Sequence, residues 1–158
     1  MRIIGIDPGT ATTGFGVIDV EGGKFKLVDA GVITTPADRP MPDRLVTLHE
    51  ELLEILRETK PEQAVVEQLF FATNVTTAIT VGQARGVILL SLAEAGLSPA
   101  EYTPMQIKQA VTGYGGAKKP QIQEMVRVLL GLSTIPRPDD AADALAAAIT
   151  HANSAKYQ

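Results

Sequence analysis

Four carboxylate residues stand where a fold can bring their side chains together, although they are far apart in the chain: Asp7, Glu67, Asp140 and Asp143. Asp7 and Glu67 each end an apolar run that is typical of a buried strand. Asp140 and Asp143 share one face of an Ala-rich helix, because residues three apart are neighbours on a helix. Gathered carboxylates repel one another, and a hard divalent cation held by oxygen ligands is the usual compensation. The pattern therefore predicts a metal site.

Each of these residues also has a structural interpretation. Asp7 opens Asp-Pro-Gly, an ordinary turn sequence in which an aspartate caps the turn. Glu67 could form a surface salt bridge at the end of its strand. Asp140 and Asp143 follow Pro138-Asp139, and acids are favoured at a helix start by the dipole and the free N–H groups. One cap needs only one acid, so we expect Asp139 to cap the helix and the other two to face the acidic cluster.

A second group of residues suits a phosphate-bearing partner. The chain has a net charge of −4, yet residues 105–130 have a net charge of +3. Lys118 and Lys119 open a predicted helix, where cations oppose the dipole, and a nearby phosphate backbone would explain them. The alternative is that both are ordinary solvated lysines. The small, hydroxyl-rich segment 9–14 would also let the backbone approach a phosphate closely.

Phe70 and Phe71 are adjacent, so in an extended segment they point in opposite directions. One is expected to pack in the core. The other could stack on a base or wedge a nucleic-acid strand.

Composition limits the class of protein. The 158 residues fit one domain spanning 1–158, and 45% of them are apolar. The absence of cysteine excludes a disulfide, a thiol nucleophile and a thiolate zinc site. Arg2 leads straight into a strand pattern, so no secretory signal is expected. The longest apolar stretch, Val87–Leu92, is too short to span a bilayer. We therefore expect a soluble, cytoplasmic protein with no membrane partner.

Hydrophobic periodicity predicts an α/β sandwich with a mixed sheet. The expected strands are residues 2–7, 14–20, 24–33, 63–67 and 100–103. The expected helices are residues 43–59, 74–95, 105–112, 119–131 and 140–155. The first three strands form an antiparallel meander and the later ones belong to a parallel part. Ligands bind beyond the carboxyl ends of parallel strands, where Asp7 and Glu67 stand.

The long helix predicted at 74–95 carries small residues every four positions: Ala78, Gly82 and Gly86. Such a stripe lets another helix approach closely, from this chain or from a partner subunit. Apolar residues also cover a broad arc of this helix, so we expect it to be buried on two sides, as in a dimer.

Five segments together resemble the RuvC family, the bacterial Holliday junction resolvases. They are Gly5-Ile6-Asp7-Pro8-Gly9, Val66-Glu67-Gln68, Gly82-Gln83-Ala84-Arg85-Gly86, Met105-Gln106-Ile107-Lys108-Gln109 and Asp140-Ala141-Ala142-Asp143-Ala144-Leu145-Ala146. The resemblance runs nearly the whole length, in order and with compatible spacing. No single segment would suffice, but five in register are highly specific.

The resemblance implies an RNase H-like fold with a mixed five-stranded sheet, a homodimer, and Mg²⁺-dependent nicking of four-way DNA junctions in recombination and repair. The family's four catalytic carboxylates match Asp7, Glu67, Asp140 and Asp143. Its basic residues match Lys108 and Lys119, and its junction-contacting aromatic matches Phe70. Lys118 is assigned to DNA binding by its charge alone. The family also works with the branch-migration proteins RuvA and RuvB and prefers certain short sequences at the cut.

The four carboxylates could hold two Mg²⁺ ions about 4 Å apart, as in two-metal nucleases, and Mn²⁺ is expected to substitute. In-line attack would leave a 5′ phosphate and a 3′ hydroxyl. Lys119 would neutralise the phosphate near the cut, and Lys108 would bind the backbone or support the site.

Two alternatives remain at this point. One is a phosphotransferase of the actin and sugar-kinase type, which opens with a similar phosphate loop but needs a second domain. The other is a non-catalytic junction-binding module of the same fold, in which unneeded acids would repel DNA.

Overall fold

The structure is a computed structural model that describes residues 1–68 and 74–155. Its strands are β1 (Arg2–Asp7), β2 (Thr12–Glu21), β3 (Lys24–Thr34), β4 (Gln63–Glu67) and β5 (Ala100–Tyr102). Its helices are α1 (Met41–Thr59), α2 (Val75–Glu94), α3 (Pro104–Thr112), α4 (Lys119–Leu129) and α5 (Asp139–Ser154). Every strand and helix that the sequence predicts is present.

The strands form one mixed sheet in the order β3-β2-β1-β4-β5. β1, β2 and β3 pair antiparallel, whereas β4 pairs parallel with both β1 and β5. The predicted mixed sheet is therefore confirmed. β2 starts at Thr12 rather than at residue 14, because Thr12 and Thr13 already pair with the end of β3. Threonine is β-branched and favours a strand, although the glycines around it suggest a loop.

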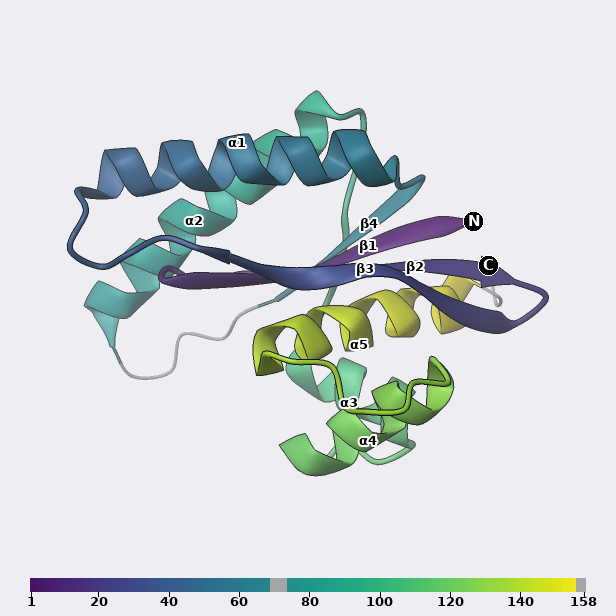
Figure 1. Ribbon diagram of the computed structural model, residues 1–158. Helices are drawn as coiled ribbons and strands as arrows, with labels where there is room; N and C mark the ends of the chain where they lie inside the picture. Colours follow the sequence, from purple (N-terminus) through teal and green to yellow (C-terminus); the bar gives the residue numbers. More distant parts are fainter. Residues whose placement is uncertain (69–73, 156–158) are drawn as a thin grey trace.

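Two helical layers cover the sheet, as Figure 1 shows, with α1 and α2 on one face and α3, α4 and α5 on the other. Alternate residues of a strand point to opposite faces, so β1 contributes to both cores. Ile4 and Ile6 pack with α1 and α2, while Ile3 packs with α5 and its neighbours. The central strands are thus buried on both sides and hold their carboxyl ends in fixed positions.

Helix α5 lies unusually close to β1 and β2, because glycines line the sheet beneath it. A Cβ atom added at Gly5 would lie 2.0 Å from the carbonyl oxygen of Ala144, and one at Gly14 would lie 2.0 Å from that of Asp140. Gly14 is also the cross-strand partner of Asp7. The approach therefore places the first turn of α5, with its aspartates, beside the end of β1.

Helix α2 has one apolar side that this chain leaves uncovered. Val75, Ile79 and Leu90 are exposed by 76%, 57% and 53%. A Cβ added at Gly82 or Gly86 would meet nothing within 4 Å, so neither glycine serves a close contact within the chain. By length and composition, α2 is the one helix in the described residues that could cross a membrane, and 22% of that window is buried. The chain covers only one of the two sides that the sequence predicts to be buried.

Replacing Gly5 by alanine should force α5 away from the sheet, because the new Cβ would overlap the backbone of Ala144. Overpacking of this kind costs on the order of 1–3 kcal/mol. In a protein of this size that corresponds to a fall in melting temperature of roughly 2–12 °C. Thermal unfolding followed by circular dichroism measures the change.

Glu51→Ala is the control, because Glu51 is exposed on α1 and lies outside the contact of α5 with the sheet. It should change the free energy of unfolding by less than about 0.5 kcal/mol. Equal stability of the two variants would contradict the close contact of α5 with β1.

Candidate active site

The fold brings three of the four predicted carboxylates into one cluster at the end of β1. Asp7, Asp140 and Asp143 each offer a carboxylate oxygen, and these three atoms lie within 4.8 Å of one another. Oxygens on opposite sides of a Mg²⁺ ion are about 4 Å apart, because each lies about 2.1 Å from the ion. The three side chains are only partly buried, so an ion can reach them. Their spacing and chemistry therefore fit a hard divalent cation.

Glu67 joins the cluster from the neighbouring parallel strand. Its side chain shares a hydrogen bond with Asp7, and the charge of Asp143 acts on it as well. It also lines a cavity of about 250 Å³ beside the cluster. The other lining residues are Pro104, Ile107, Lys108, Lys119, Ile122, Asp143 and Ala146. Acidic and basic residues thus line one small cavity.

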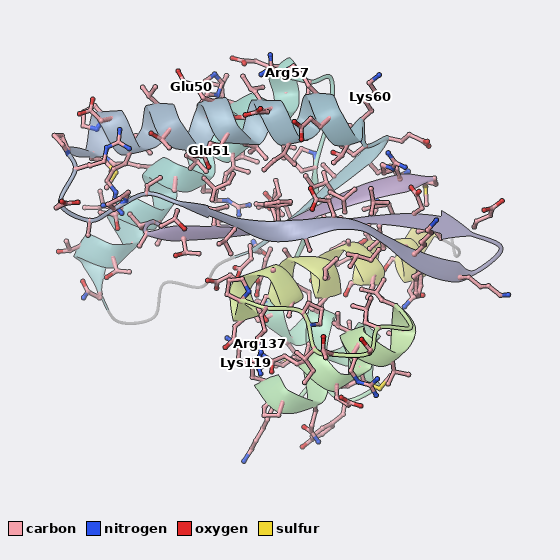
Figure 2. The ribbon with its side chains drawn as sticks, in the orientation of Figure 1. Glu50, Glu51, Arg57, Lys60, Lys119 and Arg137 are labelled. Atoms are coloured by element: carbon pink, nitrogen blue, oxygen red, sulfur yellow. The ribbon has the colours of Figure 1, made fainter. Side chains whose placement is uncertain are left out.

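Lys119, the first residue of α4, faces the acids across this cavity. Its Nζ atom lies 3.5 Å from Oδ2 of Asp139 and 3.6 Å from Oδ2 of Asp143. Burial opposes its charge, but Asp143 and Asp139 outweigh that effect and raise the pKa of Lys119. Figure 2 shows Lys119 and Arg137 on the side of the sheet that carries α3, α4 and α5. Lys119 is therefore a cation at the edge of an acidic cluster.

The prediction that Asp139 caps α5 is wrong. Pro138 occupies the capping position, and no side chain bonds the free N–H groups there. The carboxylate of Asp139 instead accepts hydrogen bonds from Gln123 and Arg137, each 3.0 Å long. These neighbouring cations and donors attract the side chain away from its own backbone. Asp139 thereby holds Lys119 and Arg137 beside the cluster, a role that the sequence analysis missed.

Burial and mutual repulsion make the cluster hard to ionise fully. Burial and the proximity of Glu67 raise the pKa of Asp7 to about 9. Burial also raises the pKa of Glu67 and that of Asp143, against the opposing effect of Lys119. Asp7 therefore keeps a proton at neutral pH, which a bound cation would displace.

The loop after Asp7 is fixed by residues that the sequence analysis did not single out. Thr35 donates to the carbonyl of Thr10 at 2.7 Å, and the buried Arg44 donates to the carbonyl of Thr35 at 3.0 Å. Arg44 shares a buried stripe of α1 with Leu48 and Leu52. A charged residue on an apolar stripe is the signal that would have revealed it.

The remaining predicted DNA-binding residues have different positions. Lys108 lines the cavity with Glu67 and Lys119. Lys118 precedes α4, is exposed, and is not among the residues that line the cavity. Phe70 lies outside the described residues. The segment at Thr10 contacts Thr80 of α2, so part of it serves packing within the chain.

A larger cavity of about 680 Å³ lies at the far ends of α1 and α2. Glu50 and Arg57 of α1 and Lys60, which follows this helix, line it, and Figure 2 shows them across the sheet from Lys119. None of the predicted site residues lines it, so size alone does not identify the active site.

The mixed sheet, its two helical layers and the carboxylates at its strand ends define an RNase H-like nuclease that uses a divalent metal. A family model described as "Crossover junction endodeoxyribonuclease RuvC" matches residues 3–151. The chain belongs to the RuvC family.

Similar proteins agree with this assignment. Crossover junction endodeoxyribonuclease RuvC from Chloroflexus aggregans is 61% identical over 155 residues, which cover 98% of this chain and 94% of the relative. The enzyme from Desulfitobacterium hafniense is 57% identical, with 98% and 93% covered.

Solved structures give the same picture. Thermus thermophilus RuvC superposes with a TM-score of 0.93 at 42% identity, covering 99% of this chain and 96% of that one. The same enzyme in complex with a Holliday junction substrate gives 0.92 at 40% identity, again covering 99% and 96%. The yeast mitochondrial Holliday junction resolvase, at 16% identity, shares the fold with a TM-score of 0.67. The chain is therefore a Holliday junction resolvase, and the kinase-like and non-catalytic alternatives are not favoured.

The metal-free protein should lose stability as the pH rises from 3.8, the ordinary pKa of an aspartate, towards 9, the raised pKa of Asp7. Between these two values Asp7 is protonated in the folded protein but ionised in the unfolded chain, so a rise in pH favours unfolding. Asp7→Asn replaces the carboxyl group by an amide, which is neutral without taking up a proton on folding, so at pH 8 in a chelator its melting temperature should exceed that of the original protein by roughly 2–6 °C. Thermal unfolding between pH 5 and pH 9 measures both effects.

Asp38→Asn is the control, because Asp38 is exposed and lies outside the cluster. It should leave the pH dependence unchanged. Identical profiles of melting temperature against pH for Asp7→Asn and the original protein would show that folding does not raise the pKa of Asp7.

Proposed function

We propose that this resolvase makes paired, symmetric, metal-dependent nicks in four-way DNA junctions with the cluster at the end of β1. The observation that carries the proposal is the meeting of Asp7, Asp140 and Asp143 within 4.8 Å, with Glu67 hydrogen-bonded to Asp7. A junction-binding protein without catalysis gains nothing from four acids facing DNA, because they repel phosphates. The cluster has a use only if a cation neutralises it.

The four carboxylates are proposed as the metal ligands and as catalytic residues. Asp7 and Glu67 come from the ends of adjacent parallel strands, and Asp140 and Asp143 from the first turns of α5. Two Mg²⁺ ions, for which Mn²⁺ can substitute, would supply an activated water and stabilise the leaving 3′ oxygen. The rigid strand ends and α5 fix the oxygens in advance, so little reorganisation is needed when an ion binds.

Lys119 is proposed to neutralise the phosphate at the cut. It is 51% exposed, so its ammonium group can leave Asp139 and Asp143 for a DNA phosphate without a large desolvation cost. Lys108, across the same cavity, is proposed to bind the DNA backbone. Lys118 would add a peripheral phosphate contact, and Phe70 a contact with a junction base.

The exposed side of α2 is proposed as the homodimer surface. Val75, Ile79 and Leu90 are large apolar residues exposed by more than half. Gly82 and Gly86 lie open on the same helix, so the backbone of a partner helix can approach there. A two-fold axis at this surface would give two active sites related by symmetry, which suits two opposed strands of a junction.

Further proposals concern the setting of the enzyme. The whole chain, residues 1–158, would act as one nuclease domain in the cytoplasm. There it would cut junctions presented by the RuvA and RuvB branch-migration proteins. Its choice of cutting site would include a preference for a short DNA sequence.

Cleavage of a labelled four-way junction tests the site. With Mg²⁺ the original protein should give paired nicks with 5′ phosphates. Asp7→Asn should lower the rate by at least about 10³-fold, since it removes a central metal ligand. Lys119→Ala should lower it about 10–100-fold, as expected for the loss of one charge next to the reacting phosphate. Gel analysis of both labelled strands under single-turnover conditions measures the rates.

Lys118→Ala is the matched control for Lys119→Ala and should change the rate by less than about threefold, because an exposed phosphate contact adds little. An unchanged rate for Lys119→Ala would remove that residue from the site. Junction binding without nicks by the original protein would refute the cleavage proposal.

Ile79→Glu should convert the dimer to a monomer, because it would place a charge in an apolar interface. Light scattering after size exclusion measures the mass, and paired nicking should be lost together with the dimer. Val128→Glu, on the exposed side of α4, is the control and should leave the mass unchanged. A dimer that survives Ile79→Glu would place the interface elsewhere.

A further inference from the structure

Arg85 of α2 contacts the end of β4 from the face of the sheet that carries α1 and α2. Its Nη1 donates a hydrogen bond of 3.0 Å to the main-chain carbonyl oxygen of Glu67. Its Nη2 forms an ion pair with the carboxylate of Glu101, in β5. The Arg85 side chain is only 18% exposed. One guanidinium therefore joins α2 to two neighbouring strands at the point where Glu67 enters the site.

The sheet holds this strand end weakly. The pairs between β1 and β4 end at Ile6 and Val66, one residue before Glu67. On the other side β5 is only three residues long, and its last pair is that of Glu67 with Tyr102. Gln68 adds one hydrogen bond of 2.8 Å to the carbonyl of Tyr102. The carbonyl of Glu67 therefore needs a donor from outside the ladder with β1, and Arg85 supplies it.

Electrostatic repulsion also acts on the side chain at this strand end. The side chain of Glu67 lies against Asp7 and near Asp143, and acidic groups crowded in this way repel one another. A strand end that could move would relieve this repulsion by carrying the carboxylate away from the cluster. A fixed carbonyl prevents that movement, because the backbone of Glu67 sets where its side chain begins.

We propose that Arg85 is a positioning residue, which fixes the main chain of Glu67 so that its carboxylate stays at the metal cluster. The proposal rests on the proposed catalytic role of Glu67. Glu101 neutralises the charge of Arg85, so the guanidinium acts through its geometry. Arginine is required because its planar fork presents two donors in fixed directions, whereas lysine is a point charge.

The test compares Arg85→Met and Arg85→Lys with the same changes at Arg127. Arg127 is a matched control, because it also joins a main-chain carbonyl, that of Leu132, to a glutamate, Glu124. It lies near the far end of α4 and does not line the active-site cavity. The comparison therefore separates the general effect of losing an arginine that joins a carbonyl to a glutamate from the particular effect of losing Arg85.

Arg85→Met should lower the single-turnover cleavage rate about 10–100-fold, the usual effect of removing a residue that supports a metal ligand. Junction affinity measured in a chelator should stay within about twofold, because Arg85 itself touches no DNA in this proposal. The Ca²⁺ concentration that gives half of the thermal stabilisation should rise several-fold. Arg85→Lys should restore only part of the loss, and both Arg127 variants should cleave normally when folded.

Three outcomes would overturn the proposal: a normal cleavage rate for folded Arg85→Met, a loss confined to junction affinity, or full rescue by Arg85→Lys. Failure of the proposed function is recognised separately, because the original protein would then make no nicks. The first of these outcomes, accompanied by a melting temperature as low as that of Arg127→Met, would make Arg85 an ordinary structural residue.

Discussion

The close contact between α5 and the central strands is the constraint on which the site depends. A helix normally packs on a sheet through intervening side chains, but Gly5, Gly14 and Gly16 remove them here. The facing side of α5 is built of alanines such as Ala144 and Ala148, so backbone meets backbone. Asp140 and Asp143 reach Asp7 only because of this approach. Short acidic side chains could not bridge an ordinary distance between helix and sheet.

The carboxylates gathered in this arrangement repel one another, and neighbouring residues on several elements reduce the repulsion. Lys119 and Lys108 face the acids across the cavity, and Asp139 holds Lys119 there. Two cations do not neutralise four carboxylates, and burial next to Glu67 raises the pKa of Asp7. A carboxyl group that keeps its proton in the absence of metal can exchange that proton for a divalent cation. The expected loss of stability without metal and the proposed binding of metal thus have one cause, the crowding of the carboxylates.

Local patterns predicted the strands, the helices and the four carboxylates, because these follow from periodicity and from the ends of apolar runs. The error at Asp139 arose because a helix start is locally the same whether its acid caps the backbone or bonds Gln123 and Arg137 across space. Arg44 and Arg85 were missed for the same reason, since their partners lie on other elements. Phe70 lies outside the described residues, so its contact with DNA stays a prediction.

Helices on both faces of the sheet position the acidic residues of the site. α5 supplies Asp140 and Asp143 from one face of the sheet. From the other face, Arg44 of α1 fixes Thr35 and so the loop after Asp7, while Arg85 of α2 reaches the carbonyl of Glu67. Helix α2 also carries the uncovered apolar side proposed to meet a partner subunit. A shift of α2 would therefore reach Glu67 through a single side chain, so the proposed pairing of two subunits through α2 would be linked to the position of Glu67 in each site.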